Sequence, residues 1–336
     1  ASCIKPMKPY TSSFENEYPH AKKTYEVARE SITRIFGDAR VGKSLDVEKT
    51  RQTVGNLVES VMRHPDALML MTTMQDKSKQ AVAHAINVCA MSVTFGRSLG
   101  FDERQLSELG IGALLHDIGQ IKLDQELLEN FSNCSETQLK HFQDHTSYGS
   151  AILHNTEGLP ASATSIARDH HERSNGTGYP QKLLGNEVDL FTKVVSIVDI
   201  YDNVTSGMHG LPSIPCTEAL KNMYTWRKNL FDPLLVEKFI QCLGIYPIGS
   251  VVELTSGDIG IVISLNPDLR LLPTVMLVKN SQKQTIETPK LINLSLFMRD
   301  ASEQKKKIEI RRVLKTEEND IDVRSYILRE LPPLSL

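Results

Sequence analysis

Apolar residues recur at intervals of three and four through most of the first 245 positions, which is the pattern of helices that bury one face. The first 20 residues instead hold three prolines and little periodicity, so they are predicted to be irregular. Three helices are predicted next, over residues 22–37, 46–64 and 65–74. They hold no cluster of metal-ligand residue types, so residues 1–75 are predicted to be a short helical adapter or dimerisation segment.

The helical pattern continues from residue 76 to residue 247, with Gly and Pro gathered in the connections. Eight helices are predicted there, over residues 78–98, 103–118, 124–131, 135–156, 160–171, 187–205, 216–228 and 232–243. Eight of the ten histidines of the chain also lie in this region, between His84 and His209. We therefore predict that residues 76–247 form the catalytic unit.

Beyond Pro247 the pattern changes to short runs of β-branched residues separated by turn residues. Strands are predicted over residues 251–254, 259–263, 274–278 and 284–287. The charged tail from Ser302 keeps Ile308, Ile310 and Val313 in alternation and is predicted to be an extension rather than a binding arm. The predicted fold class is thus mainly α, with a small β-hairpin extension within residues 248–336.

Composition narrows the classes of partner. The 336 residues are 40% hydrophobic and 24% charged with a net charge of −3, so no basic excess favours DNA as a partner. No apolar run approaches the roughly 20 residues that span a bilayer, and no signal-peptide pattern opens the chain. The five cysteines are scattered without a CxxC pair, which favours a reducing compartment. We expect a cytoplasmic protein without a membrane segment.

Histidines and aspartates in the predicted catalytic unit form the candidate chemistry. Side chains of adjacent residues on a helix diverge by about 100°, so the pair His116-Asp117 can bind one ion through the imidazole while the carboxylate bridges to a second. His141 precedes His145 by one turn, so only one of these two need be a ligand. The candidate ligands are His84, His116, Asp117, His145, His170, His171 and Asp199.

Taken singly, these residues have ordinary explanations. A lone histidine on an apolar helix face is more often a hydrogen-bonded core residue, and a His-Asp pair often ends a helix. Burying so many ionisable groups in one helical unit requires compensation, which shared cations supply. Mixed imidazole and carboxylate ligands without thiolates suit Fe, Mn or Ni rather than structural zinc. Two such ions bridged by a carboxylate are a known arrangement for phosphoester hydrolysis.

The spacing of these ligands resembles the HD superfamily of metal-dependent phosphohydrolases. The segment from His170-His171-Glu172-Arg173 to Gly178-Tyr179-Pro180 resembles the signature of its HD-GYP subfamily, and the likeness covers about residues 76–245. It implies an HD-type helical bundle that hydrolyses a bacterial cyclic dinucleotide, cyclic di-GMP or 3′3′-cyclic GMP-AMP. The adapter and the β extension also resemble one branch of that subfamily.

The resemblance also implies roles for individual residues. Two divalent ions, Fe or Mn and less commonly Ni, are expected, and Asp117 is expected to bridge them. One would be held by His84, His116, Asp117 and Asp199, and the other by Asp117, His145, His170 and His171. A hydroxide between the metals would attack phosphorus, and a linear dinucleotide would be released. Asp117, Tyr179 and Asp202 are the expected catalytic residues. The expected substrate contacts are Gln120, Lys122, Arg173, Gly178, Tyr179, Pro180 and Asp202.

The chain departs from the family pattern at three places. Gln80 stands where some members carry a glutamate that holds a third ion, so two ions are expected. Gln120 replaces the lysine of the His-Asp-X-Gly-Lys motif, and Met208 and Leu211 replace basic residues that contact phosphate. Losing one such electrostatic contact can lower a rate on the order of 100-fold.

These departures leave an alternative open, a cyclic dinucleotide receptor with weak or no hydrolysis that signals through the N-terminal helices. A third reading, a phosphohydrolase of nucleoside triphosphates, is disfavoured by the intact Gly178-Tyr179-Pro180 segment. The methionines within residues 62–74 are expected to be exposed. Together with the apolar face of residues 46–64, they suggest a homodimer or a signalling partner.

Overall fold

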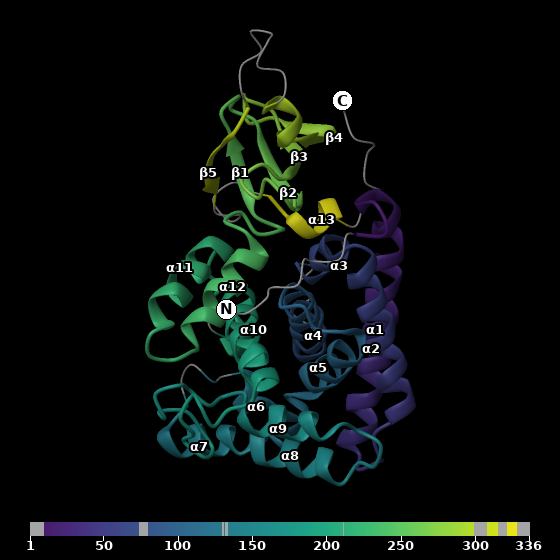
Figure 1. Cartoon of the computed structure of the whole chain (residues 1–336), viewed down its shortest axis with the longest axis vertical. Helices are drawn as coiled ribbons and strands as arrows, with labels where there is room; N and C mark the ends of the chain where they lie inside the picture. Colours follow the sequence, from purple (N-terminus) through teal and green to yellow (C-terminus); the bar gives the residue numbers. More distant parts are fainter. Residues whose placement is uncertain are drawn as a thin grey trace.

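The N-terminal helices pack along one side of the central helices (Figure 1). The structure is a computed structural model, and it describes residues 10–73, 80–129, 131, 134–210, 212–298, 308–314 and 321–327. The first three helices are α1 (Phe14–Arg40), α2 (Val47–Arg63) and α3 (Pro65–Thr72). Asp46 caps α2, accepting a hydrogen bond from the backbone N–H of Lys49.

Helix α1 begins earlier than predicted. We expected an irregular segment up to residue 20, but Ser13 caps a helix that runs through Pro19. Proline removes one backbone hydrogen bond from the interior of a helix. Burial of Phe14 and Tyr18 on the same face as Tyr25 offsets this cost. The predicted end of the third helix, Met74, lies outside the described residues.

The central region is helical, as predicted. Five of its helices are α4 (Gln80–Ser98), α5 (Glu103–Leu115), α8 (His145–His154), α9 (Ala161–Asp169) and α10 (Leu190–Ser206). The helices α6 (Gln125–Glu129), α7 (Glu136–Gln143), α11 (Cys216–Trp226) and α12 (Pro233–Leu243) and the 3-10 helices η2 (Ile118–Lys122) and η4 (Met208–Gly210) complete it. The single helix predicted over residues 135–156 is two helices, α7 and α8, which meet at Asp144.

The C-terminal region is larger than the predicted hairpin. Its strands are β1 (Val251–Leu254), β2 (Ile259–Ser264), β3 (Thr274–Lys279), β4 (Thr285–Asn293) and β5 (Ile310–Leu314). They form an antiparallel sheet in the order β4-β3-β2-β1-β5, and the sheet caps one end of the helical body (Figure 1). The 3-10 helix η5 (Leu294–Met298) follows β4, and α13 (Val323–Ile327) lies between the sheet and α3. The edge strand β5 comes from the tail that we expected to be an extension.

One hydrophobic core joins the N-terminal helices, the central helices and the sheet. Val54, Leu57 and Val61 of α2 are buried in it, as are Met69 and Met71. The expected exposure of Met69 and Met71 is therefore wrong, because the chain itself covers them and the apolar face of α2. A homodimer remains a prediction without this support, and the domain boundaries at residues 76 and 247 also remain predictions.

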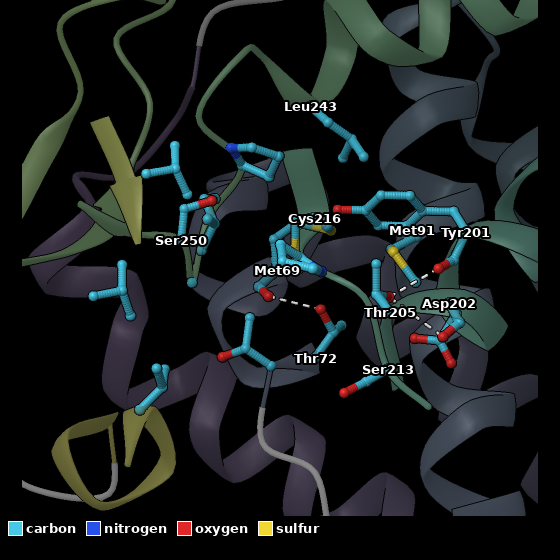
Figure 2. A pocket seen from close by; sticks show the side chains of 18 of the residues that line it. Met69, Thr72, Met91, Tyr201, Asp202, Thr205, Ser213, Cys216, Leu243 and Ser250 are labelled. Atoms are coloured by element: carbon cyan, nitrogen blue, oxygen red, sulfur yellow. Dashed lines mark hydrogen bonds between the residues drawn. The ribbon is translucent and has the colours of Figure 1, made fainter. Parts of the chain in front are cut away.

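A cavity of about 750 Å³ lies where α3, α10 and the sheet meet (Figure 2). Thr72, Asp202, Thr205 and Ser250 are among its lining residues. No helix in the described ranges is long and apolar enough to cross a membrane.

Candidate metal centre

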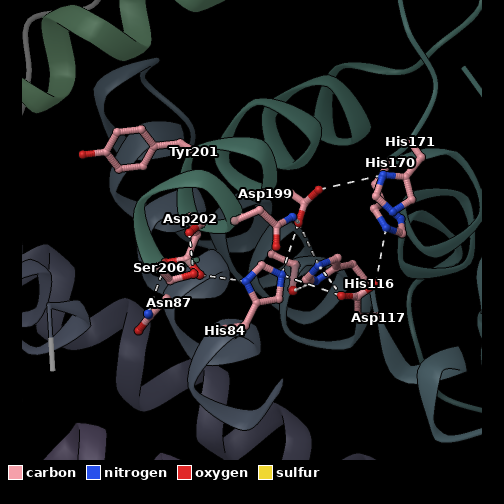
Figure 3. Close-up of polar contacts among 12 residues, drawn as sticks. His84, Asn87, His116, Asp117, His170, His171, Asp199, Tyr201, Asp202 and Ser206 are labelled. Atoms are coloured by element: carbon pink, nitrogen blue, oxygen red, sulfur yellow. Dashed lines mark hydrogen bonds and ion pairs between the residues drawn. The ribbon is translucent and has the colours of Figure 1, made fainter. Parts of the chain in front are cut away.

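The seven predicted ligands converge from five helices on one cluster. Figure 3 labels all of them except His145. His84 lies on α4, His145 is the first residue of α8, and Asp199 lies on α10. His116 ends α5, and Asp117 follows it. The doublet His170-His171 follows the end of α9. Residues up to 115 positions apart in the sequence therefore meet because the helices pack side by side.

Asp117 stands between two sets of histidines. Its Oδ2 lies 3.7 Å from His84 Nε2 and 3.5 Å from His116 Nε2. Its Oδ1 lies 3.3 Å from His145 Nε2 and 3.5 Å from His170 Nε2. Each oxygen thus faces a different pair of imidazoles, which is the arrangement that a bridging carboxylate needs.

Asp199 completes the arrangement from the opposite side. Its Oδ1 lies 3.2 Å from His84 Nε2 and 3.6 Å from His116 Nε2, and its Oδ2 lies 4.0 Å from His171 Nδ1. We call His84, His116, Asp117 Oδ2 and Asp199 Oδ1 the His84 group. His145, His170, His171 and Asp117 Oδ1 form the His145 group.

The atoms that face the centre of the cluster lack ordinary partners. Six of them are buried with no hydrogen bond in the described part of the chain: the Nε2 atoms of His84, His116, His145 and His170, Asp117 Oδ1 and Asp199 Oδ2. Buried polar atoms normally find partners, so such a concentration requires an explanation. Divalent cations satisfy these nitrogen and oxygen atoms together, and the donor set therefore fits metal ions.

The opposite sides of three of the rings are held in place by the backbone. Nδ1 of His116 donates to Ala113 O over 2.7 Å, Nδ1 of His145 to Phe142 O over 2.7 Å, and Nδ1 of His170 to Ile166 O over 3.0 Å. A proton on Nδ1 leaves the lone pair of Nε2 free for a cation. Backbone carbonyls therefore fix both the orientation and the tautomer of these three histidines.

Electrostatics in the cluster favour ionised carboxylates. Burial alone would raise the pKa of Asp117, but His116, His145 and His170 lower it well below its usual range. Burial and the neighbouring His170 lower the pKa of His171 well below the usual value. Charged aspartates and a neutral His171 are the protonation states that bind cations.

The structure distinguishes the two histidines that the sequence left open. His145 is fully buried in the cluster, whereas His141 is 43% exposed and lies 3.6 Å from the carboxylate of Asp144. His145 is therefore the member of the pair that can serve as a ligand.

The Gly178-Tyr179-Pro180 segment borders the His145 group. The ring of Tyr179 packs against that of His171, with centroids 4.7 Å apart, and its backbone N–H donates to His171 O. Glu172 holds the far end of this loop, accepting hydrogen bonds from the backbone N–H groups of Gln181 at 2.6 Å and Leu183 at 2.9 Å. These contacts are compatible with the predicted place of Tyr179 beside the substrate.

Three other predicted substrate contacts have different surroundings. Gln120 is buried, and its amide donates to Asp117 Oδ2 over 2.6 Å, so it acts on the cluster itself. Arg173 donates to His170 O, Glu172 O and Ser196 Oγ and lies over the Phe231 ring. Lys122 is exposed at the end of η2, and no described hydrogen bond or ion pair joins it to the cluster. Gln120 and Arg173 thus contact the surroundings of the cluster, and the substrate contacts of Gln120, Arg173 and Lys122 stay predictions.

Asp202 contacts His84, and its catalytic role and its contact with substrate stay predictions. Its Oδ2 lies 2.7 Å from His84 Nδ1, and its Oδ1 accepts from Asn87 Nδ2 over 3.2 Å, on the side of His84 away from the cluster. This geometry favours an orienting role over direct contact with substrate or reacting atoms. Gln80 donates to Gly207 O, and Met208 is buried. Leu211 lies outside the described residues.

Sequence reasoning missed three residues around the cluster. Asn203 donates to Asp199 Oδ1 over 2.7 Å, and Asn87 holds Asp202. Both lie one helical turn after a ligand, so a search at three- and four-residue spacing could have found them. His209 packs against Phe142, whose ring also contacts His145. No pattern in the sequence singles it out.

The buried histidines and aspartates of this helical body are placed to hold divalent cations, which is typical of metal-binding helical proteins. Residues 68–235, half of the chain, match the sequence model of the HD domain family. The chain belongs to that family, and the family predicted from the ligand spacing is confirmed.

Several characterised proteins are similar to this chain. A cyclic di-GMP phosphodiesterase of Pseudomonas aeruginosa is 29% identical over 267 residues, which cover 80% of this chain and 64% of that protein. A 3′3′-cGAMP-specific phosphodiesterase of Vibrio cholerae is 27% identical over 51% of this chain and 37% of its own length. The chain thus spans less than two thirds of these relatives.

A solved structure shares the fold. An HDG"Y"P protein from Bdellovibrio bacteriovorus superposes with a TM-score of 0.56 at 21% identity, over 66% of this chain and 71% of that one. At this identity the likeness speaks for the fold alone.

Proposed function

We propose that this protein is a metal-dependent phosphodiesterase that hydrolyses a bacterial cyclic dinucleotide to its linear form. The observation that carries the proposal is the buried set of unpartnered ligand atoms around both oxygens of Asp117. The similarity to phosphodiesterases of cyclic di-GMP and 3′3′-cGAMP supports the substrate class.

The His84 group would hold one divalent ion and the His145 group a second, with Asp117 shared between them. Ions bound there would lower the pKa of water and neutralise charge on a phosphoryl group. The protein supplies the geometry: Gln120 restrains Asp117, Asn203 restrains Asp199, and the helix carbonyls fix three of the imidazoles. The loop held by Glu172 places Tyr179 at the edge of the cluster, where we propose that it contacts the substrate.

Incubation of the full chain with cyclic di-GMP and with 3′3′-cyclic GMP-AMP tests the proposal. The protein is loaded with Mn²⁺ or Fe²⁺ under reducing conditions, and the products are separated by chromatography. We expect a linear dinucleotide from at least one substrate. Further cleavage to mononucleotides is not expected, because Gln80 is a poor ligand for a third ion. Intact substrate with both ions bound would refute the catalytic proposal.

A matched pair of variants assigns the activity to this cluster. His145→Ala removes a ligand of the His145 group, whereas His141→Ala removes an exposed histidine one turn away. We expect His145→Ala to lose both turnover and one equivalent of metal, and His141→Ala to retain both. Asp117→Ala should abolish turnover and the binding of both ions, because both groups share this residue.

The receptor function is the second candidate, and Gln120 and Met208 favour it. Both are neutral where relatives carry cations, so the site lacks two charges that could stabilise a phosphoryl transition state. A receptor would bind the cyclic dinucleotide, release no linear product, and gain no activity from Gln120→Lys. An enzyme slowed by the missing charge would become faster in that variant.

A further inference from the structure

His84 is oriented differently from the other buried ligands. His116, His145 and His170 each donate from Nδ1 to a backbone carbonyl three or four residues earlier in the chain. His84 Nδ1 instead faces Asp202 Oδ2 of another helix, α10, at 2.7 Å. The position of its ring therefore depends on tertiary packing rather than on the backbone of its own helix.

The partner of His84 is the middle of a longer buried network (Figure 3). Asp202 Oδ1 accepts from Asn87 Nδ2 over 3.2 Å, and the same amide nitrogen lies 3.1 Å from Thr72 O at the end of α3. Asn87 Oδ1 accepts from the Tyr25 hydroxyl over 3.0 Å. Tyr25, Asn87, Asp202 and His84 are each at most 5% exposed. A continuous set of hydrogen bonds thus runs from α1 to a ligand of the candidate metal centre.

The donors and acceptors in this network fit only one arrangement. For His84 to bind a cation through Nε2, its proton must sit on Nδ1, and Asp202 Oδ2 accepts it. Asp202 Oδ1 then accepts from the Asn87 amide, whose oxygen is left for the Tyr25 hydroxyl. A carboxylate at position 202 is the side chain that accepts both bonds at once. It also raises the basicity of the imidazole, which strengthens a metal bond.

We propose that Asp202, Asn87 and Tyr25 are positioning residues that make the metal affinity of the His84 group depend on the placement of helix α1. The network gives the N-terminal helices a physical route to the metal centre. The inference rests on the metal-binding part of the proposed function, not on its substrate.

Cobalt(II) titration of the metal-free full chain tests this directly, because the visible absorption of bound Co²⁺ reports ligand number and geometry. Asp202→Asn keeps the shape of the side chain, but its amide has a single acceptor oxygen, whereas His84 and Asn87 each donate to the carboxylate. We expect affinity for one ion to fall by about 10- to 100-fold, the usual effect of losing such an outer hydrogen bond, while the second ion binds as in the wild type.

A pair of tyrosine variants on one helix isolates the contribution of α1. Tyr25→Phe removes the hydroxyl that holds Asn87, whereas Tyr18→Phe removes one that donates to Ile327 O on α13. Both tyrosines are buried on α1, so the two changes are chemically matched. We expect Tyr25→Phe to weaken the same ion as Asp202→Asn by about 3- to 10-fold, the equivalent of one hydrogen bond. Tyr18→Phe should bind both ions normally.

The possible results separate the failure of this inference from that of the proposed function. Wild-type affinities in Asp202→Asn, or equal weakening of both ions, would overturn the positioning role. Equal effects of Tyr25→Phe and Tyr18→Phe would overturn the route from α1. A chain that binds two ions but cleaves neither cyclic dinucleotide refutes the phosphodiesterase alone. Circular dichroism of each metal-free variant verifies that it is folded.

Discussion

At the scale of single residues, Gly119 shows how closely the elements around the cluster approach. A Cβ at this position would lie 1.9 Å from His145 O and 2.5 Å from Gly149 N. Both atoms belong to the backbone of α8 and cannot move without moving the helix. The glycine two residues after Asp117 is therefore required by space, because it lets η2 lie directly against the helix that carries His145.

Gly119→Ala is expected to push the first turn of α8, and His145 with it, away from Asp117. Overpacking of this kind typically costs about 1–3 kcal/mol of stability. We expect a lower denaturation midpoint in urea and weaker binding of the ion held by the His145 group. Equilibrium unfolding and metal titration measure these two effects.

Gly55 provides the matched control. It lies within α2, and a Cβ there would meet no atom within 4 Å. Gly55→Ala should leave metal binding unchanged and stabilise the protein by about 0.5–1 kcal/mol, because alanine loses less conformational entropy in a helix. If both alanine variants behaved alike, the steric account of Gly119 would be wrong.

The sequence predicted the types of the ligands better than the contacts around them. Histidines and aspartates at helical positions pointed to a metal site, and the structure brings all seven together. The partners of Gln120 and Asp202 were not predictable, because they depend on which way each side chain turns once the helices have packed. A short polar residue on a helix looks the same in the sequence whether it faces substrate or a ligand.

At the scale of elements, one carboxylate holds the loop between α9 and α10. Glu172 is 4% exposed and accepts from two backbone N–H groups of that loop. Gly178 packs so tightly against the start of the loop that a Cβ would lie 2.4 Å from Arg173 N. The Gly178-Tyr179-Pro180 segment is therefore a fixed wall beside the His145 group.

Glu172→Gln should loosen this wall, because an amide offers one acceptor where the loop presents two donors. A buried donor left without a partner costs about 1–3 kcal/mol. We expect faster hydrogen exchange at the Gln181 and Leu183 amides and, in the proposed reaction, a higher KM with a smaller change in kcat.

Glu187→Gln is the control for that change. Glu187 also accepts from a backbone N–H of this loop, that of Leu184, but it is exposed, so water can replace the lost bond. Its exchange rates and KM should stay close to those of the wild type. A large effect there would show that any carboxylate change disturbs the loop.

Helix positions were predictable at this scale, and pairings distant in the sequence were not. The alternation of Ile310 and Val313 was visible in the sequence, but the partner of that strand is β1, about 60 positions earlier. The break at Asp144 was hidden because the apolar pattern continues across it. Local periodicity indicates an element, whereas tertiary packing decides where it ends and what it pairs with.

At the scale of the whole molecule, the cluster concentrates unpaired polar atoms in the core, so occupancy by metal should affect global stability. A ligand that binds only the folded state adds about 2.7 kcal/mol at 100 times its Kd. We expect chelation to lower the Tm by several degrees and re-addition of Mn²⁺ to restore it. Calorimetry of the wild type with and without chelator measures the shift. Asp117→Ala should show no such shift.

A buried carboxylate on α3 also joins this helix to the sheet. Asp66 is buried, and its Oδ2 accepts from Ser264 Oγ at 2.9 Å and from Leu265 N at 2.7 Å. Burial raises the pKa of Asp66 above its ordinary value. The folded state therefore retains a proton that the unfolded state releases, and stability falls as the pH rises from about 4, the unfolded value, through the raised pKa.

Asp66→Asn should remove that part of the pH dependence while keeping an acceptor for the sheet. As the pH rises from about 4 through the raised pKa of Asp66, the wild type should lose stability that the variant keeps. The unfolding free energy of the variant relative to that of the wild type should therefore increase. Asp66→Ala should be destabilised at every pH, because Ser264 and Leu265 lose their acceptor. Urea unfolding at a series of pH values measures both, and a pH-independent difference for Asp66→Asn would contradict the assignment.

The bond from the Tyr18 hydroxyl to Ile327 O joins residues 309 positions apart, and Asp66 contacts Ser264 across 198 positions. Closing loops of this length is slow, because their entropy is lost before the contacts form. During synthesis, the N-terminal helices would emerge from the ribosome long before the sheet that completes their core. The apolar faces of these helices would stay uncovered until the rest of the chain is synthesised. The nascent protein would therefore depend on chaperones or on temporary contacts among α1, α2 and α3.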